Sequence, residues 1–274
     1  MVRSRCAWHA APGRAQLTPT LAVEPAASRP DRPAKSGAPA RVFAPGEAAP
    51  GCWFCLSTGK DVHLIVSVAE HVYLAVDKGA LCDDHVLLVP VEHFASSNVL
   101  PGFAQEEMWR YCGALRRCFA STRQGAQLLL FERHLALRGK GGNHAHVNAL
   151  PLPPAAAAGA RQAFEEAAAR VGFAFAFLPP PPAAPEAAHQ LAQVIPPGAE
   201  FFCVTLPDGA RLVHPISQGE RFSMQFGREV CAALLGTPDK ADWRNCTADE
   251  QGEEARAAAF KALFETYDPF AVAE

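Results

Sequence analysis

Proline marks out the parts of this 274-residue chain that can form a folded core. Eight of the 24 prolines lie before residue 51, and seven lie between Pro179 and Pro197. Proline lacks a backbone N–H and fixes its own φ, so a stretch dense in proline resists both helix and sheet. The sequence therefore predicts three parts, namely a leader at residues 1–50, a folded region at residues 51–178 and a second region at residues 179–274.

The leader at residues 1–50 is rich in Ala, Pro and Arg and shows no sustained period of 2 or 3.6. Such a segment cannot bury enough apolar surface to offset its ordering entropy, so we expect it to be disordered. Arg3, Arg5 and Arg14, with no acidic residue before Glu24, also fit an organelle transit peptide. An unstructured extension or an imprecise gene start is the simpler interpretation.

Composition excludes several classes of protein. The 25 Lys and Arg against 28 Asp and Glu give a formal net charge of −3, which argues against broad nucleic-acid coating but allows a local basic patch. No apolar run reaches the ~18 residues of a membrane span, so we expect no membrane partner. Nine cysteines, an odd number scattered through a chain too long to need disulfide staples, indicate a reducing compartment.

The hydrophobic pattern predicts the fold class α+β. Strands are expected at residues 62–68, 72–76, 84–90, 126–132 and 144–152, and helices at 105–122 and 155–171. After a stiff proline-rich connector at 179–185, the pattern predicts a hairpin at 200–214 and helices along 222–234 and 248–267. We therefore expect an antiparallel sheet with helices, followed by a smaller C-terminal α+β module.

The stretch most informative about chemistry is Asn143-His144-Ala145-His146-Val147-Asn148. In a strand, alternate side chains share a face, so His144, His146 and Asn148 would project together. The preceding loop contains the candidate phosphate-binding residues Arg138, Gly139, Lys140, Gly141 and Gly142. A glycine-rich loop leading into paired histidines suits attack at phosphorus with imidazole as the nucleophile. Alternatively, the histidines are half-exposed strand residues and the glycines only form a hairpin.

A second motif, Cys52-Trp53-Phe54-Cys55, has the spacing that lets two thiolates bind one tetrahedral Zn²⁺. It supplies two of the four ligands, and no second C-x-x-C occurs in the sequence. The remaining ligands would therefore have to come from distant histidines. The alternative is a pair of buried, reduced cysteines beside Trp53 and Phe54.

In their order along the chain, these motifs resemble the histidine-triad superfamily. The C-x-x-C is followed by His85-Val86-Leu87-Leu88-Val89-Pro90, by His93-Phe94-Ala95-Ser96, by a long helix and by the H-x-H strand. More narrowly, the chain resembles the CwfJ family of splicing-associated proteins. The marks of that family are Phe131-Glu132-Arg133, Gln225-Phe226-Gly227-Arg228-Glu229-Val230 and Ala241-Asp242-Trp243-Arg244-Asn245-Cys246.

The resemblance implies roles for individual residues. In histidine-triad enzymes the middle histidine is the nucleophile, and that position matches His146. The third triad position is Asn148, whose carboxamide cannot transfer a proton as imidazole does, so the leaving group lacks its usual proton donor. In zinc-containing members, the C-x-x-C pairs with the histidine of H-x-x-S and with the first triad histidine, which match Cys52, Cys55, His93 and His144.

The resemblance also implies a biological setting. We expect a nuclear splicing-associated factor that acts late in the spliceosome cycle or in intron-lariat turnover. Its expected partners are spliceosomal or lariat-debranching proteins and an RNA or nucleotide phosphate, and its expected cofactor is one structural Zn²⁺. The alternative is an active nucleotide or RNA phosphate hydrolase, or a nucleotidyl transferase, that uses His146, and cytoplasm is the alternative location. His85 is interpreted as an ordinary strand histidine, and Arg133 as either a phosphate contact or a surface ion pair.

Overall fold

The computed structural model describes residues 49, 51–136, 143–196 and 198–271. The predicted disordered leader, apart from Ala49, lies outside the described residues. All five residues of the predicted phosphate loop also lie outside them, namely Arg138, Gly139, Lys140, Gly141 and Gly142.

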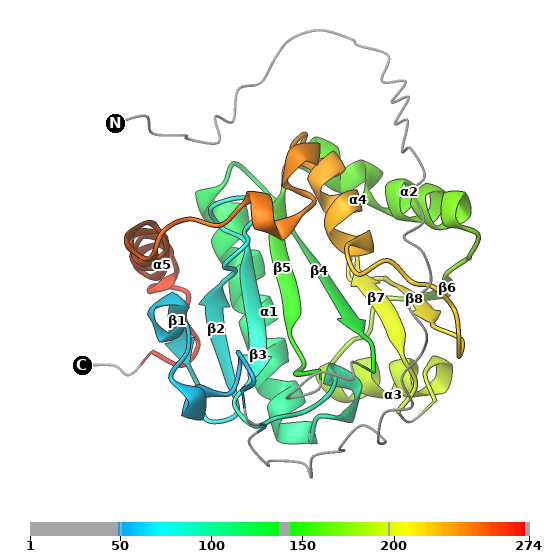
Figure 1. Cartoon of the computed structure of the whole chain (residues 1–274), viewed down its shortest axis with the longest axis horizontal. Helices are drawn as coiled ribbons and strands as arrows, with labels where there is room; N and C mark the ends of the chain where they lie inside the picture. The colour runs from blue at the N-terminus through cyan, green and yellow to red at the C-terminus, as the bar shows by residue number, and fades with distance from the viewer. Residues whose placement is uncertain (1–48, 50, 137–142, 197, 272–274) are drawn as a thin grey trace, which may run out of the picture. The chain divides into compact units, whose positions relative to one another are not determined.

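Within the described residues, eight strands form one sheet in which all neighbouring strands are antiparallel (Figure 1). They are β1 (Ile65–Val68), β2 (Val72–Val76), β3 (Val86–Pro90), β4 (Gln127–His134), β5 (Val147–Leu152), β6 (Ala176–Leu178), β7 (Phe201–Thr205) and β8 (Arg211–Pro215). Their order is β1-β2-β3-β5-β4-β7-β8-β6. Because β4 pairs with both β5 and β7, strands of the two predicted regions share a single sheet. The predicted fold class, α+β with an antiparallel sheet, is confirmed.

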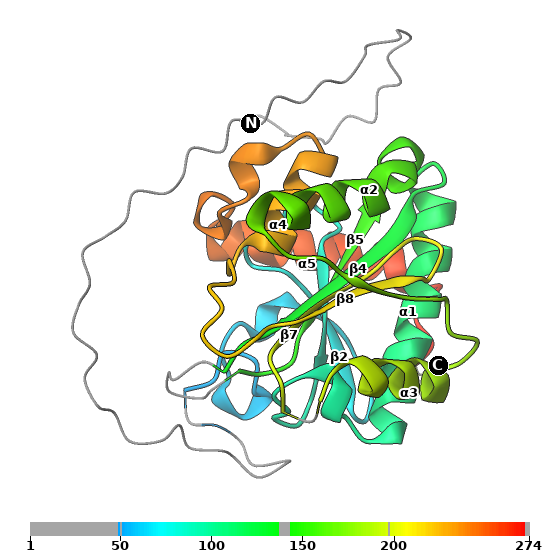
Figure 2. The ribbon, with the colours of Figure 1, turned by 90° about the vertical axis from the view of Figure 1, so that its right-hand side faces the viewer.

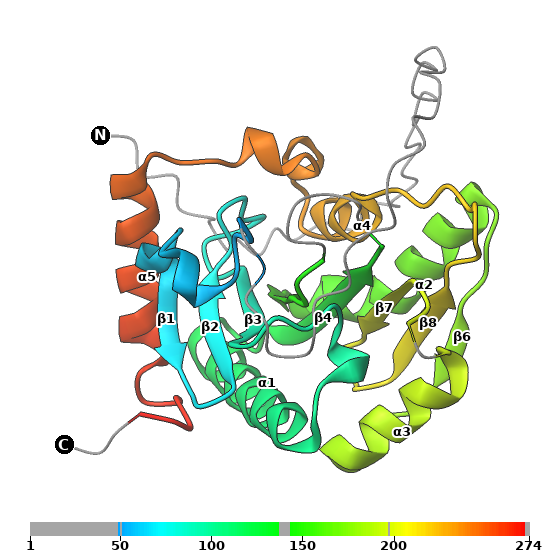
Figure 3. The same cartoon turned by 60° about the horizontal axis from the view of Figure 1, so that its bottom comes forward.

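Helices cover both faces of this sheet (Figure 3). They are α1 (Gly102–Thr122), α2 (Pro154–Val171), α3 (Ala184–Val194), α4 (Phe226–Leu234) and α5 (Glu250–Phe264). The helices α1 and α3 pack on one face, and α2 packs beside α4 on the other (Figure 2). Helix α5 packs along β1 (Figure 3). None of these helices in the described part of the chain is long and apolar enough to cross a membrane.

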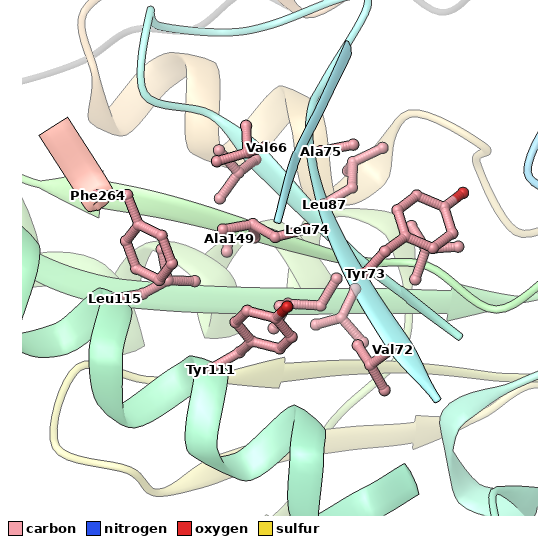
Figure 4. Close-up of a cluster of buried hydrophobic side chains, with 14 of the residues drawn as sticks. Val66, Val72, Tyr73, Leu74, Ala75, Leu87, Tyr111, Leu115, Ala149 and Phe264 are labelled. Carbon is pink, nitrogen blue, oxygen red and sulfur yellow. The ribbon is translucent and has the colours of Figure 1, made fainter. Parts of the chain in front are cut away.

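The core on the α1 face arises from the helical period of that segment. Tyr111, Leu115 and Phe119 recur at steps of four and are fully buried against the sheet. Figure 4 shows Tyr111 and Leu115 beside Phe264 of α5 and the strand residue Leu74. Sheet residues buried on both faces explain why β2 and β3 are apolar throughout instead of alternating.

The core on the opposite face is an aromatic cluster beneath α2 and α4. Phe131 of β4, Phe202 of β7 and Phe226 of α4 belong to it. Gly227 lets α4 approach closely, because a Cβ there would lie 2.7 Å from a ring carbon of Phe131. The mark Gln225-Phe226-Gly227-Arg228 is thus the contact between the C-terminal half and the centre of the sheet.

Several predicted elements need correction. The strand expected at 144–152 begins at Val147, so His144 and His146 precede it, and the alternation of a strand does not apply to them. The strand expected at 62–68 begins with a 3₁₀ turn at Val62–Leu64. Helix α3 is not predicted by the sequence pattern, because the expected proline connector at 179–185 includes its first two residues and no element is expected at 186–194. Pro185 lies in the first helical turn, where a missing N–H is harmless.

Candidate functional site

Cys52, Cys55, His93 and His144 converge on one point, with all four side chains buried and their donor atoms within 4.8 Å of one another. Nδ1 of His144 lies 3.4 Å from Sγ of Cys52 and 3.6 Å from Sγ of Cys55. Nδ1 of His93 lies 3.4 Å from Sγ of Cys55. Tetrahedral Zn²⁺, with Zn–S of ~2.3 Å and Zn–N of ~2.1 Å, would place sulfur and nitrogen about 3.6 Å apart. The four donors therefore fit a zinc ion.

Hydrogen bonds orient this metal-ligand cluster. Nε2 of His144 donates to the carbonyl of Pro90 at 2.9 Å, which leaves Nδ1 as the nitrogen that faces the sulfurs. The loop between the cysteines is fixed by Thr58, whose hydroxyl donates to the carbonyls of Cys52 and Cys55 at 3.1 and 2.8 Å. The donors are thus held in place by groups outside the cluster.

Burial sets the protonation state of these donors. It lowers the pKa of His144 to about 4 and also lowers the pKa of His93, so both rings are neutral, the form that binds metal. Burial, with a further contribution from the neighbouring Cys52, raises the pKa of the Cys55 thiol to about 11. Metal binding at this cluster would therefore release thiol protons.

Beside the cluster, a cavity of about 310 Å³ opens on the α4 face of the sheet and is lined by His146 and Asn148. Nδ1–H of His146 donates to the carbonyl of His144 at 2.9 Å, which leaves Nε2 as the unprotonated nitrogen of the ring. Burial lowers the pKa of His146, and the nearby Arg133 contributes to that decrease. The ring stacks on Phe54 at 4.7 Å between centroids. His146 is therefore a neutral, oriented imidazole in a cavity wall.

Asn148 is held by a residue that the sequence interpretation set aside. Nε2 of His85 lies 3.1 Å from Oδ1 of Asn148, and the backbone N–H of Leu81 donates to Nδ1 of His85. The proton of the His85 ring is therefore on Nε2 and is donated to the amide oxygen. His85 is fully buried, and burial lowers its pKa to about 4. It belongs to the site and is not an ordinary strand histidine.

The C-terminal half reaches this pair through Arg228. Oδ2 of Asp77 lies 3.3 Å from Nδ1 of His85 and accepts a hydrogen bond from Arg228 at 3.1 Å. Arg228 also donates to the carbonyls of Gly79, Lys240 and Ala241. Contacts thus run from α4 through Asp77 and His85 to Asn148. Nothing in the spacing of these residues along the sequence predicts this connection.

Arg133, which the sequence predicts as either a phosphate contact or a surface ion pair, lies in the wall of the cavity. It lines the cavity with His146, and its Nη1 donates to the carbonyl of Met224. Its Nε is buried and has no hydrogen-bond partner among the described residues. Burial lowers its pKa. Arg133 is therefore a partly buried cation without a carboxylate beside it in the part of the chain that the structure describes.

The adjacent residue, Glu132, points to the other face of the sheet. Its carboxylate accepts from the backbone N–H of Ser97 at 2.8 Å and from the Ser97 hydroxyl. Burial raises the pKa of Glu132 to about 7. This contact fixes the loop that follows His93, so Glu132 helps to position a residue of the metal-ligand cluster without touching it.

Two family models match the chain, each over a separate range of residues. Residues 47–165 match the model described as a protein similar to CwfJ C-terminal, and residues 183–269 match the one described as CwfJ C-terminus 2. The chain belongs to the CwfJ C-terminal family. The two matches include every described residue of the metal-ligand cluster and of the Asn148–His85–Asp77–Arg228 connection.

Curated relatives of this CwfJ chain include plant and animal proteins. It is 38% identical over 219 residues to zinc finger CCCH domain-containing protein 59 of Oryza sativa subsp. japonica, which covers 80% of this chain and 35% of the relative. It is 36% identical over 222 residues to CWF19-like protein 1 of Homo sapiens, covering 79% of this chain and 38% of that protein. The chain thus spans little more than a third of the length of these relatives.

Solved structures similar to this CwfJ chain include a yeast phosphorylase and a bacterial histidine triad family protein. A yeast Ap4A phosphorylase in complex with Ap4A aligns with a TM-score of 0.40 and 14% identity, over 67% of this chain and 77% of that chain. A Zn-bound histidine triad family protein from Mycobacterium smegmatis aligns with a TM-score of 0.32 and 16% identity, over 38% of this chain and 76% of that chain.

Proposed function

We propose that this protein is a splicing-associated factor that binds an RNA or nucleotide phosphate in the cavity of His146. In this proposal it acts in the nucleus, late in the spliceosome cycle or in intron-lariat turnover, with spliceosomal or lariat-debranching proteins as partners. Membership of the CwfJ family and similarity to CWF19-like proteins support the splicing role. The placement of Arg133 beside His146 supports the phosphate.

The chemistry of Arg133 carries this proposal. A partly buried guanidinium is unfavourable unless an anion pairs with it, and the described residues place no carboxylate against Arg133. A phosphate oxygen matches the planar fork of arginine and would satisfy the unpartnered Nε. The acids that line the cavity are already engaged, since Asp61 pairs with Lys78 and Asp77 with Arg228. The cavity therefore has a net attraction for an anion.

We also propose one structural Zn²⁺ held by Cys52, Cys55, His93 and His144. The ion would supply a crosslink between the loop that carries Phe54 and the segment that carries His146. Its support is the convergence of two sulfur and two imidazole donors, a set that suits Zn²⁺. The protein's own contribution is the Pro90 carbonyl, which orients His144.

A binding measurement tests the phosphate proposal. Two forms of a short single-stranded RNA, one with a 5′-phosphate and one with a 5′-hydroxyl, are each titrated with the protein. Fluorescence anisotropy measures the two affinities. We expect the 5′-phosphate to improve affinity and Arg133→Ala to remove that improvement, a loss of about tenfold or more for a charge-assisted hydrogen bond. Arg161→Ala, an exposed arginine on α2, is the matched control and should change nothing. The proposal would be overturned if Arg133→Ala kept the same gain in affinity from the 5′-phosphate as wild type.

A second candidate function is hydrolysis or nucleotidyl transfer by His146. It is favoured by the neutral imidazole whose Nδ1–H is bound to a carbonyl, because the free Nε2 can attack phosphorus. Attack would form an N–P bond and break the bond to the leaving group, which would take its proton from solvent because Asn148 cannot supply one. The test is turnover of adenosine phosphoramidate by wild type and His146→Ala. Equal, negligible turnover in both would remove the enzymatic role.

A further inference from the structure

Two exposed tryptophans line the cavity of His146, one from each end of the folded chain. Trp53 is 55% exposed and Trp243 is 40% exposed. Both belong to the cavity wall, together with Met224, which is 53% exposed. Large apolar side chains gathered at an open cavity are typical of a surface that binds a ligand.

Trp53 lies on a backbone that cannot move freely. Its neighbours Cys52 and Cys55 are part of the metal-ligand cluster, and the carbonyls of both accept hydrogen bonds from Thr58. The ammonium of Lys60 lies 5.8 Å from the centre of the Trp53 ring. The rigid loop therefore presents an aromatic face with a cation beside it.

Trp243 lies on an equally fixed segment of the C-terminal half, a 3₁₀ turn at Trp243–Asn245. Asp242 caps that turn by accepting from the backbone N–H of Arg244 at 3.0 Å. The backbone of the turn sits so close to Gly79 that a Cβ there would lie 2.7 Å from Cβ of Trp243. Arg228 also holds the preceding carbonyl, that of Ala241. Several contacts therefore fix the backbone of Trp243, although its side chain is exposed.

We propose that Trp243 and Trp53 are stacking surfaces for nucleobases of a single-stranded RNA whose phosphate occupies the cavity beside His146 and Arg133. This inference rests on the proposed phosphate site and names its ligand class. Aromatic rings stack on any base, so they give affinity without strict sequence preference. The second tryptophan comes from the C-terminal half, so that half completes the binding site.

The charges on the cavity wall favour RNA over a protein surface as the occupant. Lys60 and Arg133 form no ion pair with a carboxylate in the described ranges, whereas the two acids of the wall are already paired. Aromatic faces interleaved with unpaired cations are the pattern of single-strand binding grooves. A free nucleotide shares this chemistry but offers only one base, whereas an RNA end offers several.

The test compares a 5′-phosphorylated five-nucleotide RNA with AMP in anisotropy and competition titrations at fixed salt. We expect Trp243→Ala to weaken RNA binding about tenfold, as for loss of one stacked base, and to change the affinity for AMP less than twofold. Trp243→Phe keeps an aromatic face and should restore RNA affinity to within about twofold of wild type. Phe103→Ala removes a ring that is 57% exposed outside the cavity and is the matched control.

The outcomes separate this inference from the phosphate site. Equal RNA affinity of wild type and Trp243→Ala, with Arg133→Ala still weakened, would overturn the stacking role and leave the phosphate site standing. Equal weakening of RNA and AMP by Trp243→Ala would overturn the assignment to RNA. No binding of the phosphorylated RNA by wild type would overturn both.

Discussion

The metal-ligand cluster and the cavity of His146 lie side by side but differ in how completely their polar atoms are paired. In the cluster, four buried donors face one another, and the Pro90 carbonyl takes the remaining N–H of His144. In the cavity, Nε2 of His146 is unprotonated and Nε of Arg133 lacks a partner within the described residues. A closed set of donors stabilises a fold, whereas an open set is available to a ligand.

The two sites also differ in which parts of the chain build them. The cluster uses residues that lie between positions 52 and 144, all within the first family match. The cavity is built by both matched ranges, because Arg228 and Trp243 of the second range complete its wall. Stability and ligand binding should therefore respond differently to changes in the two halves.

The largest expected effect on stability follows from removing donors of the metal-ligand cluster. Replacing Cys52 and Cys55 together with serine removes both sulfur donors, and we expect the free energy of unfolding to fall by about 4 kcal/mol or more. Chemical denaturation measures it, and metal analysis should give about one zinc per wild-type chain and none in the variant. Cys82→Ser, outside the cluster, is the control. Full stability without zinc would show that the cluster is only a pair of buried cysteines.

The next largest effect concerns Arg228, through which the C-terminal half contacts the residues beside the cavity of His146. Arg228→Met leaves the partly buried Asp77 without its cation, and we expect a loss of about 3 kcal/mol in the free energy of unfolding. Arg244→Met breaks a solvent-exposed pair with Asp242 and should leave the free energy of unfolding close to that of wild type. Similar losses in both variants would contradict the bridging role of Arg228.

A pH experiment compares the two sides of β4, where Glu132 holds the loop beside the metal-ligand cluster and Arg133 lines the cavity of His146. Burial raises the pKa of Glu132 from 4.5 to about 7, so the folded state holds this proton more tightly than the unfolded state does. The stability it contributes is present below pH 4.5 and is lost as the pH rises through about 7.

Glu132→Gln removes that titration, because an amide can accept from the Ser97 backbone and donate to its hydroxyl. From pH 4.5 to 8, the free energy of unfolding of wild type should fall by about 3 kcal/mol relative to the variant. Denaturant titrations at several pH values measure this difference. A constant difference would mean that Glu132 is not the group that titrates.

The smallest effect concerns the contact between α4 and the sheet. Gly227→Ala places a Cβ 2.7 Å from the Phe131 ring, but alanine also favours the helix. We expect these opposing terms to leave a loss of about 1 kcal/mol in the free energy of unfolding. Gly159→Ala on α2, where a Cβ meets nothing within 4 Å, should be neutral or stabilising. A stabilised Gly227→Ala variant would show that α4 does not need this close approach.

Local patterns in the sequence were enough for part of this account. The strand at Val72–Val76 was predicted with its exact limits, and the hairpin of β7 and β8 was predicted from its Pro-Asp-Gly turn. The convergence of Cys52, Cys55, His93 and His144 was expected from a family resemblance. The spacing of the two cysteines alone indicated only half of that set, and the roles of these residues stay a prediction.

Contacts between distant segments were not available from local pattern. His85 resembles any histidine at the start of an apolar strand, and only the register Leu87↔Asn148 brings β3 beside Asn148. Arg228 is a helix residue whose partner Asp77 lies 151 positions earlier. The alternation argument for His144 and His146 failed because both precede β5, so their placement depends on hydrogen bonds and not on the pleat.

The central claim is that RNA occupies the cavity between the two halves of the chain. Photocrosslinking of the full chain to a 5′-phosphorylated RNA with 4-thiouridine in its first positions, followed by peptide mass spectrometry, tests it most directly. We predict crosslinks in residues 51–60 and 241–246, the segments that carry Trp53 and Trp243, and their loss in Arg133→Ala. Crosslinks confined to other surfaces, such as α2 or β6, would contradict the account.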